Sequence, residues 1–276
     1  MLADNRISLG ISPCPNDTYI FYCLLHGWVD LQGLSLQVRF KDVQSLNQMA
    51  CRQELDVVKL SVAAYPQVRE HYHLLRAGGA LGWGCGPLLV SRRPCSLHDL
   101  PQATIAVPGR MTTACKLLEL MGWHQGQKLE LDYSMIMPAV AKGHADAGLV
   151  IHEGRFTYSQ QGLHLVLDLG QWWEEKTGLP LPLGIIACHK RLGREFVPWM
   201  EARIRSSLEL VRAQPDLAWD FIRSKALEMD EGTILRHIET FVTEYSYDLG
   251  SQGQKALDCL LQQDPAYEGS GPGPRA

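Results

Sequence analysis

Short apolar runs that end abruptly in polar residues recur along this chain, and segments of helical spacing separate them. The clearest run covers residues 147–151 (A-G-L-V-I), and the polar sequence H-E-G-R follows it at once. Such a run is typical of a strand buried in a parallel sheet. The other strand-like runs lie at 7–11, 34–40, 56–61, 88–90, 104–107, 131–136, 163–169 and 185–188. Strands that alternate with helices predict an α/β fold in which helices cover both faces of parallel sheets.

The alternation restarts near residue 94, which divides the chain into two series. We therefore predict two α/β lobes, a larger one made of residues 1–92 and 188–276 and a smaller one made of residues 93–187. The larger lobe should end in helices, because apolar residues at spacings of three and four occur at 196–212, 217–227, 231–245 and 251–262. Residues 172–184 are expected to form an irregular connection, and the Gly- and Pro-rich segment 268–276 a disordered tail.

Charge and composition exclude several classes of partner. The net charge is −4, so the chain lacks the excess of Lys and Arg that nucleic-acid binding requires. No apolar stretch reaches about 18 residues, and residues 1–6 do not resemble the start of a secretion signal. We expect a cytoplasmic protein without membrane contact. Eight cysteines without a C-x-x-C pair argue against a disulfide framework and against structural zinc.

The candidate functional residues follow the predicted strands. Asn16 lies in the loop after the first strand, Ser61 ends the third, Thr112 and Thr113 follow the strand at 104–107, and His152 follows the run 147–151. Ligands of open α/β sheets bind outside the carboxyl ends of the strands. We therefore expect these side chains to converge on one crevice between the lobes.

His152 is the candidate for proton transfer in this crevice. An imidazole with an ordinary pKa of about 6.5 can accept a proton near neutrality and return it later. The alternative is a structural histidine that hydrogen-bonds to a neighbouring loop. Glu153 could orient the ring. Arg155 could pair with a substrate carboxylate or, equally, with Glu153, Asp146 or a helix end.

Thr112 and Thr113 stand at the start of the helical run 114–121, where unpaired amides and the helix dipole favour a carboxylate. N-capping by threonine is an alternative that can share this turn. Asn16, with its two following residues, is expected to cap the helix at 18–26. Lys59, within a strand-like run, could be a Schiff-base amine or a snorkelling side chain.

Other motifs do not complete a site. The glycine-rich segment 78–87 matches neither phosphate-loop pattern and is better explained as a connection between domains. His71 and His73 lack the further ligands of a metal site, and no G-x-S-x-G elbow surrounds Ser61. We therefore predict neither a metal nor a cofactor.

Six groups of residues carry a family resemblance. They are S-P-C-P-N-D-T at 12–18, K-L-S at 59–61, G-A-L-G at 79–82 with G-P-L at 86–88, P-G-R at 108–110 with T-T-A at 112–114, G-L-V-I-H-E at 148–153 with R-F-T-Y at 155–158, and W-W-E at 172–174 with 177–184. Together they resemble the 1,4-dihydroxy-6-naphthoate synthase family, which serves bacterial menaquinone biosynthesis by the futalosine route. The resemblance covers most of residues 7–190, and the terminal helices match only in general character.

The resemblance implies a fold like the type 2 periplasmic binding proteins, with the ligand cleft between two lobes, and a lyase reaction without a cofactor. The implied substrate is the carboxylate cyclic de-hypoxanthinylfutalosine, and the products are 1,4-dihydroxy-6-naphthoate and dihydroxyacetone. The family's general base maps to His152. Its substrate contacts map to Lys59, Leu60, Ser61, Thr113 and Ala114. His144 stands where an acidic residue is expected in the family.

Two other functions remain open at this point. A non-catalytic solute-binding protein would share the lobes but should carry a secretion signal. Chorismate dehydratase, from the same pathway, would share the architecture and release water from chorismate. A homodimer is also open, and Trp172 and Trp173 could line either the ligand site or a subunit contact.

Overall fold

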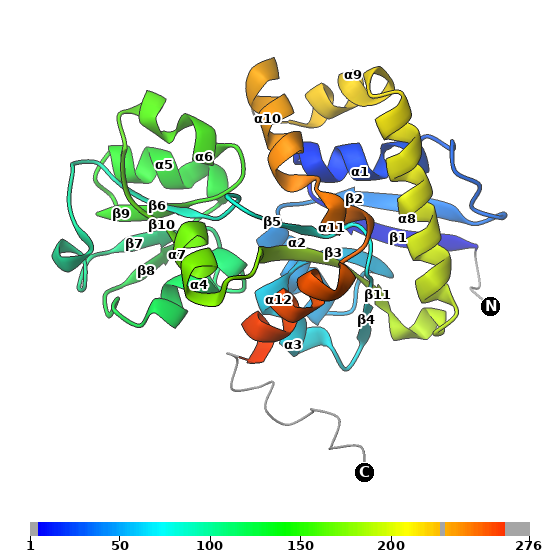
Figure 1. Ribbon diagram of the computed structural model, residues 1–276, viewed down its shortest axis with the longest axis horizontal. Coiled ribbons are helices and arrows are strands. Elements are labelled where there is room, and N and C mark those ends of the chain that lie inside the picture. Colours follow the sequence, from blue (N-terminus) through cyan, green and yellow to red (C-terminus); the bar gives the residue numbers. More distant parts are fainter. Residues whose placement is uncertain (1–4, 227–229, 263–276) are drawn as a thin grey trace, which may run out of the picture.

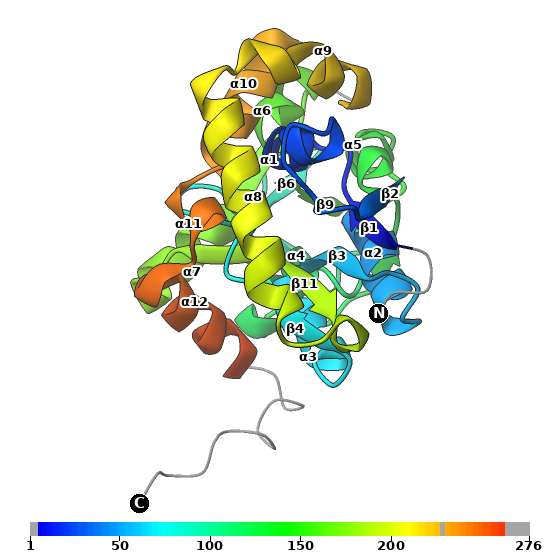
Figure 2. The same ribbon diagram turned by 90° about the vertical axis from the view of Figure 1, so that its right-hand side faces the viewer.

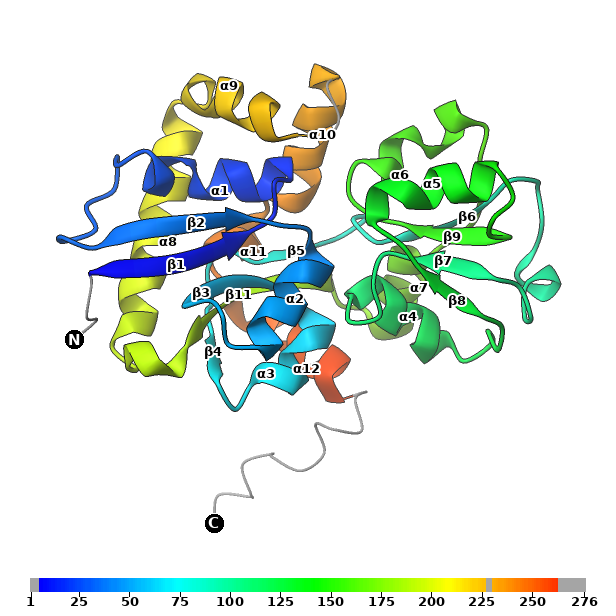
Figure 3. The same ribbon diagram turned by 180° about the vertical axis from the view of Figure 1, so that it is seen from behind.

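The structure is a computed structural model that describes residues 5–226 and 230–262. It consists of two lobes that lie side by side (Figure 1), and each lobe is built on one β-sheet. The chain runs from the larger lobe into the smaller lobe and back, as the reverse view also shows (Figure 3). Over the described ranges, no helix is long and apolar enough to cross a membrane.

The larger lobe contains a six-stranded sheet of order β2-β1-β3-β11-β4, with β5 also paired to β11. Strands β1, β2 and β3 are parallel, whereas β11 runs antiparallel to β3, β4 and β5. The strand bounds are β1 Arg6–Ile11, β2 Ser35–Phe40, β3 Val57–Ser61, β4 Tyr72–Leu74, β5 Ala80–Gly82 and β11 Leu181–His189. The prediction of a purely parallel sheet is wrong, because β11 returns from the smaller lobe and so enters the sheet at the carboxyl end of β3.

Helices cover both faces of this sheet. Successive residues of β3 and β11 point to opposite faces, and their apolar side chains pack against different helices on each face. Val57 and Ile186 belong to the core cluster formed with α1 and α8, whereas Val58 and Ile185 belong to the cluster formed with α2 and α12. Figure 2 shows α8 lying lengthwise along the larger lobe. The helix bounds are α1 Pro15–Leu25, α2 Val43–Cys51, α3 Tyr65–Val68, α8 Phe196–Ala213, α9 Asp216–Lys225, α10 Glu231–Phe241, α11 Glu244–Tyr247 and α12 Gly250–Gln262.

The smaller lobe contains a five-stranded sheet of order β10-β6-β9-β7-β8. Strand β6 is antiparallel to both neighbours, and β7 is parallel to β8 and β9. The strand bounds are β6 Leu88–Ser91, β7 Ile105–Val107, β8 Lys128–Glu130, β9 Ala147–Val150 and β10 His164–Asp168. The helix bounds are α4 Thr113–Met121, α5 Tyr133–Ala141, α6 Gly154–Thr157 and α7 Leu169–Thr177.

The sheets divide the chain a few residues before each predicted boundary. Strand β6 belongs to the smaller sheet, although residues 1–92 were assigned to the larger lobe, and β11 belongs to the larger sheet, although residues 93–187 were assigned to the smaller one. The crossovers therefore lie at 83–87 and 178–180. The second half of the glycine-rich segment, residues 83–87, forms the first of these crossovers, and residues 80–82 of that segment form β5.

Three local predictions differ from the structure. The run 131–136 is not a strand, because Asp132 accepts a hydrogen bond from Ser134 N and starts α5. The irregular connection predicted at 172–184 is wrong in both halves, because residues 172–177 belong to α7, whose N-cap is Asp168, and residues 181–184 belong to β11. Helix α1 begins at Pro15, so Asn16 lies inside the helix and does not cap it.

The C-terminal helices agree with the prediction, except that 231–245 divides into α10 and α11 at Thr243, which caps α11. The predicted tail at 268–276 lies outside the described residues.

Candidate active site

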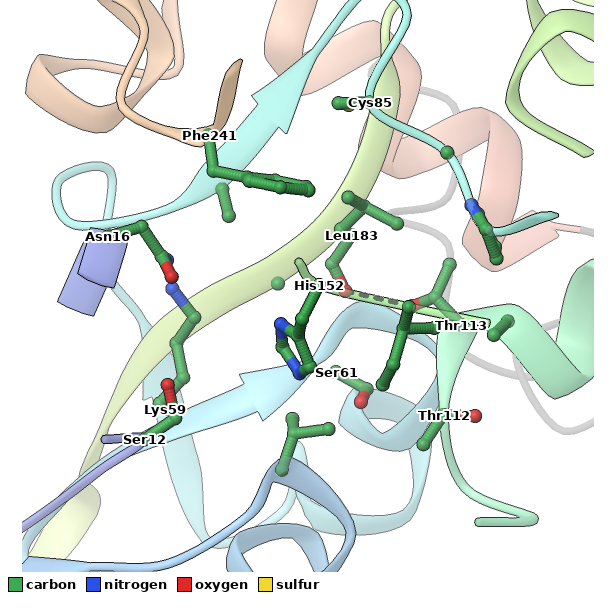
Figure 4. A pocket seen from close by; sticks show the side chains of 17 residues that line it. Ser12, Asn16, Lys59, Ser61, Cys85, Thr112, Thr113, His152, Leu183 and Phe241 are labelled. Atoms are coloured by element: carbon green, nitrogen blue, oxygen red, sulfur yellow. Dashed lines mark hydrogen bonds between the residues drawn. The ribbon is translucent and has the colours of Figure 1, made fainter. Parts of the chain in front are cut away.

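A cavity lies between the two lobes, beyond the carboxyl ends of β1, β3, β7 and β9 (Figure 4). Both lobes contribute to the lining. The predicted site residues that line the cavity are Asn16, Lys59, Ser61, Thr112, Thr113, Ala114 and His152.

The backbone at His152 is strained. Strand β9 ends at Val150, and His152 has a φ of +56°, in the left-handed region that residues with a Cβ seldom adopt. A non-glycine residue held there costs on the order of 1–3 kcal/mol and persists only where its surroundings fix it. Such strain clusters at functional sites, and here it occurs at the turn that places the imidazole on the cavity wall.

The imidazole of His152 is surrounded by side chains from both lobes. Its Nδ1 lies 3.6 Å from Cys14 Sγ, and the His237 ring stacks on it with centroids 6.0 Å apart. The Tyr133 ring meets it edge-on, with centroids 5.1 Å apart. Desolvation lowers the pKa of His152 to about 4, although the Asp17 carboxylate opposes this shift. The ring is therefore neutral at pH 7 and can accept a proton.

The polar wall of the cavity is organised by Asp17, a fully buried carboxylate on α1. Its Oδ1 accepts hydrogen bonds from Lys59 Nζ at 2.8 Å and from Asn16 Nδ2 at 2.9 Å. Its Oδ2 accepts from the backbone N–H and the hydroxyl of Ser12. Lys59 Nζ also donates to the Gly78 carbonyl at 3.3 Å. Buried charges require this kind of compensation, so the ion pair explains a lysine within an apolar strand, an arrangement that the sequence analysis did not consider.

Ser61 is held at the end of β3 by Asn47 of α2. The Ser61 backbone N–H donates to Asn47 Oδ1 at 2.9 Å, and Asn47 Nδ2 donates to Ser61 Oγ at 3.0 Å. Because the serine oxygen accepts this bond, its own hydrogen is available for a ligand in the cavity.

The first turn of α4 forms another part of the cavity wall. Thr112 is the N-cap, and its side chain accepts a hydrogen bond from Cys115 N at 3.3 Å. The Thr113 hydroxyl donates to the Leu183 carbonyl of β11 at 2.9 Å, as drawn in Figure 4, and thereby links the two lobes. The backbone N–H groups of Thr113 and Ala114 have no intrahelical acceptor, because they lie in the first turn. Capping thus leaves these amides able to bind an anion.

Two predicted contact residues do not line the cavity. Arg155 donates to Asp168 Oδ2 at 2.7 Å and to the Gly86 carbonyl. Its guanidinium is thus part of an internal ion pair, with Asp168 as the partner rather than Glu153 or Asp146. The Leu60 side chain is fully buried among the core residues packed on α2.

Four residues at the site were not predicted, and each of them either contacts the His152 ring or lines the cavity with an apolar side chain. They are Cys14, Tyr133, His237 and Phe241. His237 and Phe241 come from α10, about 85 residues after His152 in the sequence, and lie on the same face of that helix because they are four residues apart. The sequence offered one signal for this part of the site, because His237 occupies a position on the apolar face of the predicted helix. Neither Trp172 nor Trp173 lines the cavity, and Trp173 is buried in the core.

Within residues 5–226 and 230–262, no group of three or more His, Cys, Asp and Glu side chains is arranged to hold a metal ion.

Comparisons with known proteins relate the chain to a biosynthetic family. A family model described as "Menaquinone biosynthesis" matches residues 7–264. A relative from Thermus thermophilus named 1,4-dihydroxy-6-naphtoate synthase is 46% identical over 270 residues, which cover 98% of this chain and 97% of the relative. A relative of the same name from Streptomyces coelicolor is 41% identical over 270 residues, with 96% of this chain and 95% of the relative covered.

Solved structures agree with the predicted fold. A protein of Archaeoglobus fulgidus superposes with a TM-score of 0.88 at 33% identity, covering 94% of this chain and 97% of that protein. The alkanesulfonate-binding protein of Xanthomonas axonopodis superposes with a TM-score of 0.71 at 13% identity, over 97% of this chain and 95% of the other. The second likeness concerns the fold alone. It confirms the predicted architecture of two lobes like those of periplasmic binding proteins.

Proposed function

The chain belongs to the menaquinone biosynthesis family, and from this premise we propose that it is a carbon–carbon lyase of the 1,4-dihydroxy-6-naphthoate synthase type. The proposed substrate is cyclic de-hypoxanthinylfutalosine, and the products are 1,4-dihydroxy-6-naphthoate and dihydroxyacetone. The proposed general base is His152. An enzyme role agrees with the names of both relatives, and a place in menaquinone biosynthesis agrees with the description of the family model.

One observation carries the assignment of the base. The neutral His152 imidazole lines the cavity between the lobes, with Nδ1 directed at a buried thiol. Burial raises the pKa of the Cys14 thiol well above its usual value, so the sulfur stays protonated and can act as a weak hydrogen-bond donor or acceptor. In the tautomer that we propose, Nδ1 carries the hydrogen and points it at the Cys14 sulfur, so Nε2 is the nitrogen that accepts the substrate's proton.

The remaining cavity residues suit a carboxylate substrate. The first-turn amides of Thr113 and Ala114 would bind the ring carboxylate, because a helix N-terminus favours a negative charge. The hydroxyl of Ser61 would contact an oxygen of the sugar-derived part, and the ammonium of Lys59 would contact an oxygen of the ring system. Phe241, Leu183 and Pro87 provide apolar surface for the ring system.

The reaction begins when His152 Nε2 removes the proton of a sugar-derived hydroxyl. The alkoxide oxygen forms a carbonyl, and the bond between that carbon and the ring carbon breaks. The electron pair moves into the ring and onto a ring ketone oxygen, which becomes an enolate. The imidazolium returns its proton to the enolate oxygen, which becomes a ring hydroxyl, and the ring becomes aromatic as the three-carbon ketone leaves. Formation of the aromatic ring drives the cleavage.

The test is to incubate the purified protein with cyclic de-hypoxanthinylfutalosine and, separately, with chorismate, and to follow products by mass spectrometry. We expect naphthoate and a three-carbon ketone from the first substrate and no loss of water from the second. A dehydrated product from chorismate, or saturable binding of both compounds without turnover, would contradict the proposal.

A further inference from the structure

His237 is a buried histidine next to the cavity to which the mechanism above assigns no role. It lies on α10, its side chain is fully buried, and its Nε2 is 3.0 Å from Asn16 Oδ1. The Asn16 amide cannot be turned around, because its Nδ2 donates to the Asp17 carboxylate, which only accepts. His237 must therefore carry its hydrogen on Nε2 and donate it to Asn16.

This leaves Asn16 with a fixed amide and one further N–H. The amide oxygen is held by His237, and one of the two amide hydrogens is taken by Asp17. Asn16 lines the cavity, so the remaining hydrogen can reach a ligand there. A buried amide held at both ends is preorganised, which is the property that makes a hydrogen-bond donor effective in a transition state.

Lys59 lies beside this amide. Its Nζ and the Asn16 Nδ2 both donate to one atom, Asp17 Oδ1, at 2.8 and 2.9 Å, so the two nitrogens are neighbours on the cavity wall (Figure 4). The Lys59 ammonium donates a second hydrogen to the Gly78 carbonyl, and its third hydrogen can be donated to a ligand. Two adjacent N–H donors can bind one oxygen that gains negative charge.

We propose that His237 is a positioning residue that acts through Asn16. It holds the amide so that the remaining N–H, beside Lys59, donates to the ring ketone oxygen as that oxygen becomes an enolate. His237 exchanges no proton with the substrate in this step; the proton transfers stay with His152. The assignment rests on the lyase reaction proposed above, since that reaction places a developing negative charge in the cavity.

Two substitutions of His237 separate its hydrogen bond from its ring. His237→Phe keeps an aromatic ring stacked on His152 but cannot donate to Asn16. His237→Gln removes the ring but offers an amide N–H at a similar reach. Removing one oxyanion donor lowers kcat by about 100- to 1,000-fold. A misaligned donor loses less, so we expect His237→Phe to lower kcat by about 10- to 100-fold and His237→Gln to stay within about threefold of wild type.

Substitution of Asn16 tests whether His237 acts through the Asn16 amide. Asn16→Ala should lower kcat by about 100-fold, and the double variant Asn16→Ala/His237→Phe should be no slower than Asn16→Ala, because the second change acts only through the first. His26→Phe, at an exposed histidine of the same lobe, controls for the exchange itself. Thermal unfolding of each variant identifies loss of folded protein.

The outcomes are distinct. Unchanged kcat in His237→Phe, equal losses in His237→Phe and His237→Gln, or a double variant whose loss is the product of the single losses would each overturn the role of His237. Any of these results with an active wild type leaves the lyase reaction standing. No wild-type turnover of the substrate would overturn the proposed function and this inference with it.

Discussion

The two lobes hold their polar groups in different ways. In the larger lobe, Asp17, Lys59 and Asn16 form a buried network in which the side chains satisfy one another. In the smaller lobe, the cavity receives a strained His152 and the unpaired backbone amides that begin α4. The larger lobe therefore presents a fixed polar wall, whereas the groups from the smaller lobe complete their surroundings where the lobes meet.

Contacts across the cavity support this contrast. The ring of His152 is covered by Cys14 and His237, both from the larger lobe. The Thr113 hydroxyl donates to Leu183, and the side chain of Arg236 stacks over Phe156 of α6 at 5.6 Å. The low pKa of His152 is thus a property of the two lobes together, and each prediction below perturbs one side of this comparison.

The largest effect should come from breaking the network of the larger lobe. Lys59→Met leaves the fully buried Asp17 carboxylate without its cation, so the free energy of unfolding should fall by about 3–5 kcal/mol. Urea denaturation measures this loss. Adding Asp17→Asn removes the unpaired charge and should recover part of it. A loss below about 1 kcal/mol for Lys59→Met would mean that the ion pair does not hold the wall together.

The pH dependence of kcat/KM probes the surroundings of His152. Because only the neutral ring accepts a proton and its pKa is lowered to about 4, activity should persist below pH 6.5 and be lost as pH falls through about 4. The stability consequence has a definite sign. The unfolded chain takes up a proton near pH 6.5 that the folded ring refuses until about pH 4, so this histidine lowers stability progressively as pH falls between these values. If kcat/KM instead fell near pH 6.5 while the enzyme stayed folded, the pKa of His152 would be that of a solvent-exposed histidine, which would contradict its burial.

A smaller effect should follow from weakening the link between the lobes. Thr113→Val removes the hydroxyl that donates to Leu183 O and leaves that carbonyl without this bond, at a cost of about 1–3 kcal/mol. If the link supports the closed cavity, KM should rise by about tenfold while the turnover of bound substrate changes little. Thr113→Ser keeps the hydroxyl and serves as the matched control. Equal KM values for the Val and Ser variants would show that this bond does not affect binding.

The smallest expected effect concerns the strained turn of the smaller lobe. Alanine keeps a Cβ at the positive φ of residue 152, whereas glycine adopts this conformation freely. His152→Gly should therefore be more stable than His152→Ala by about 1 kcal/mol, with both inactive. Chemical denaturation of the two variants measures the difference. A more stable alanine variant would indicate that the backbone relaxes when the imidazole is absent.

Most of the architecture was predictable, because buried strands and amphipathic helices have strong local periods. The position of His152 after a buried run was also sufficient to place it near the cavity. The antiparallel return of β11 was not predictable, since an apolar run does not reveal strand direction. The prediction also failed at the starts of α5 and α7. Asp132 and Asp168 are the N-caps of these helices, and an aspartate before a helical segment is a local signal that the prediction did not use.

The partners of the site were harder to predict than the site itself. Lys59 and Asp17 are 42 residues apart, and Asn16 and His237 are 221 apart, so only the tertiary fold brings them together. Arg155 shows the same limit, because its sequence neighbourhood does not reveal that Asp168 is its ion-pair partner.

The most direct test of the central claim is single-turnover kinetics of His152→Asn with cyclic de-hypoxanthinylfutalosine. Asparagine tolerates the left-handed backbone and fills similar space but cannot serve as the base. We predict that the variant folds and binds the substrate within about tenfold of wild type, while the rate of naphthoate formation falls by about 1,000-fold. A rate within tenfold of wild type would contradict the assignment of His152 as the group that takes the proton.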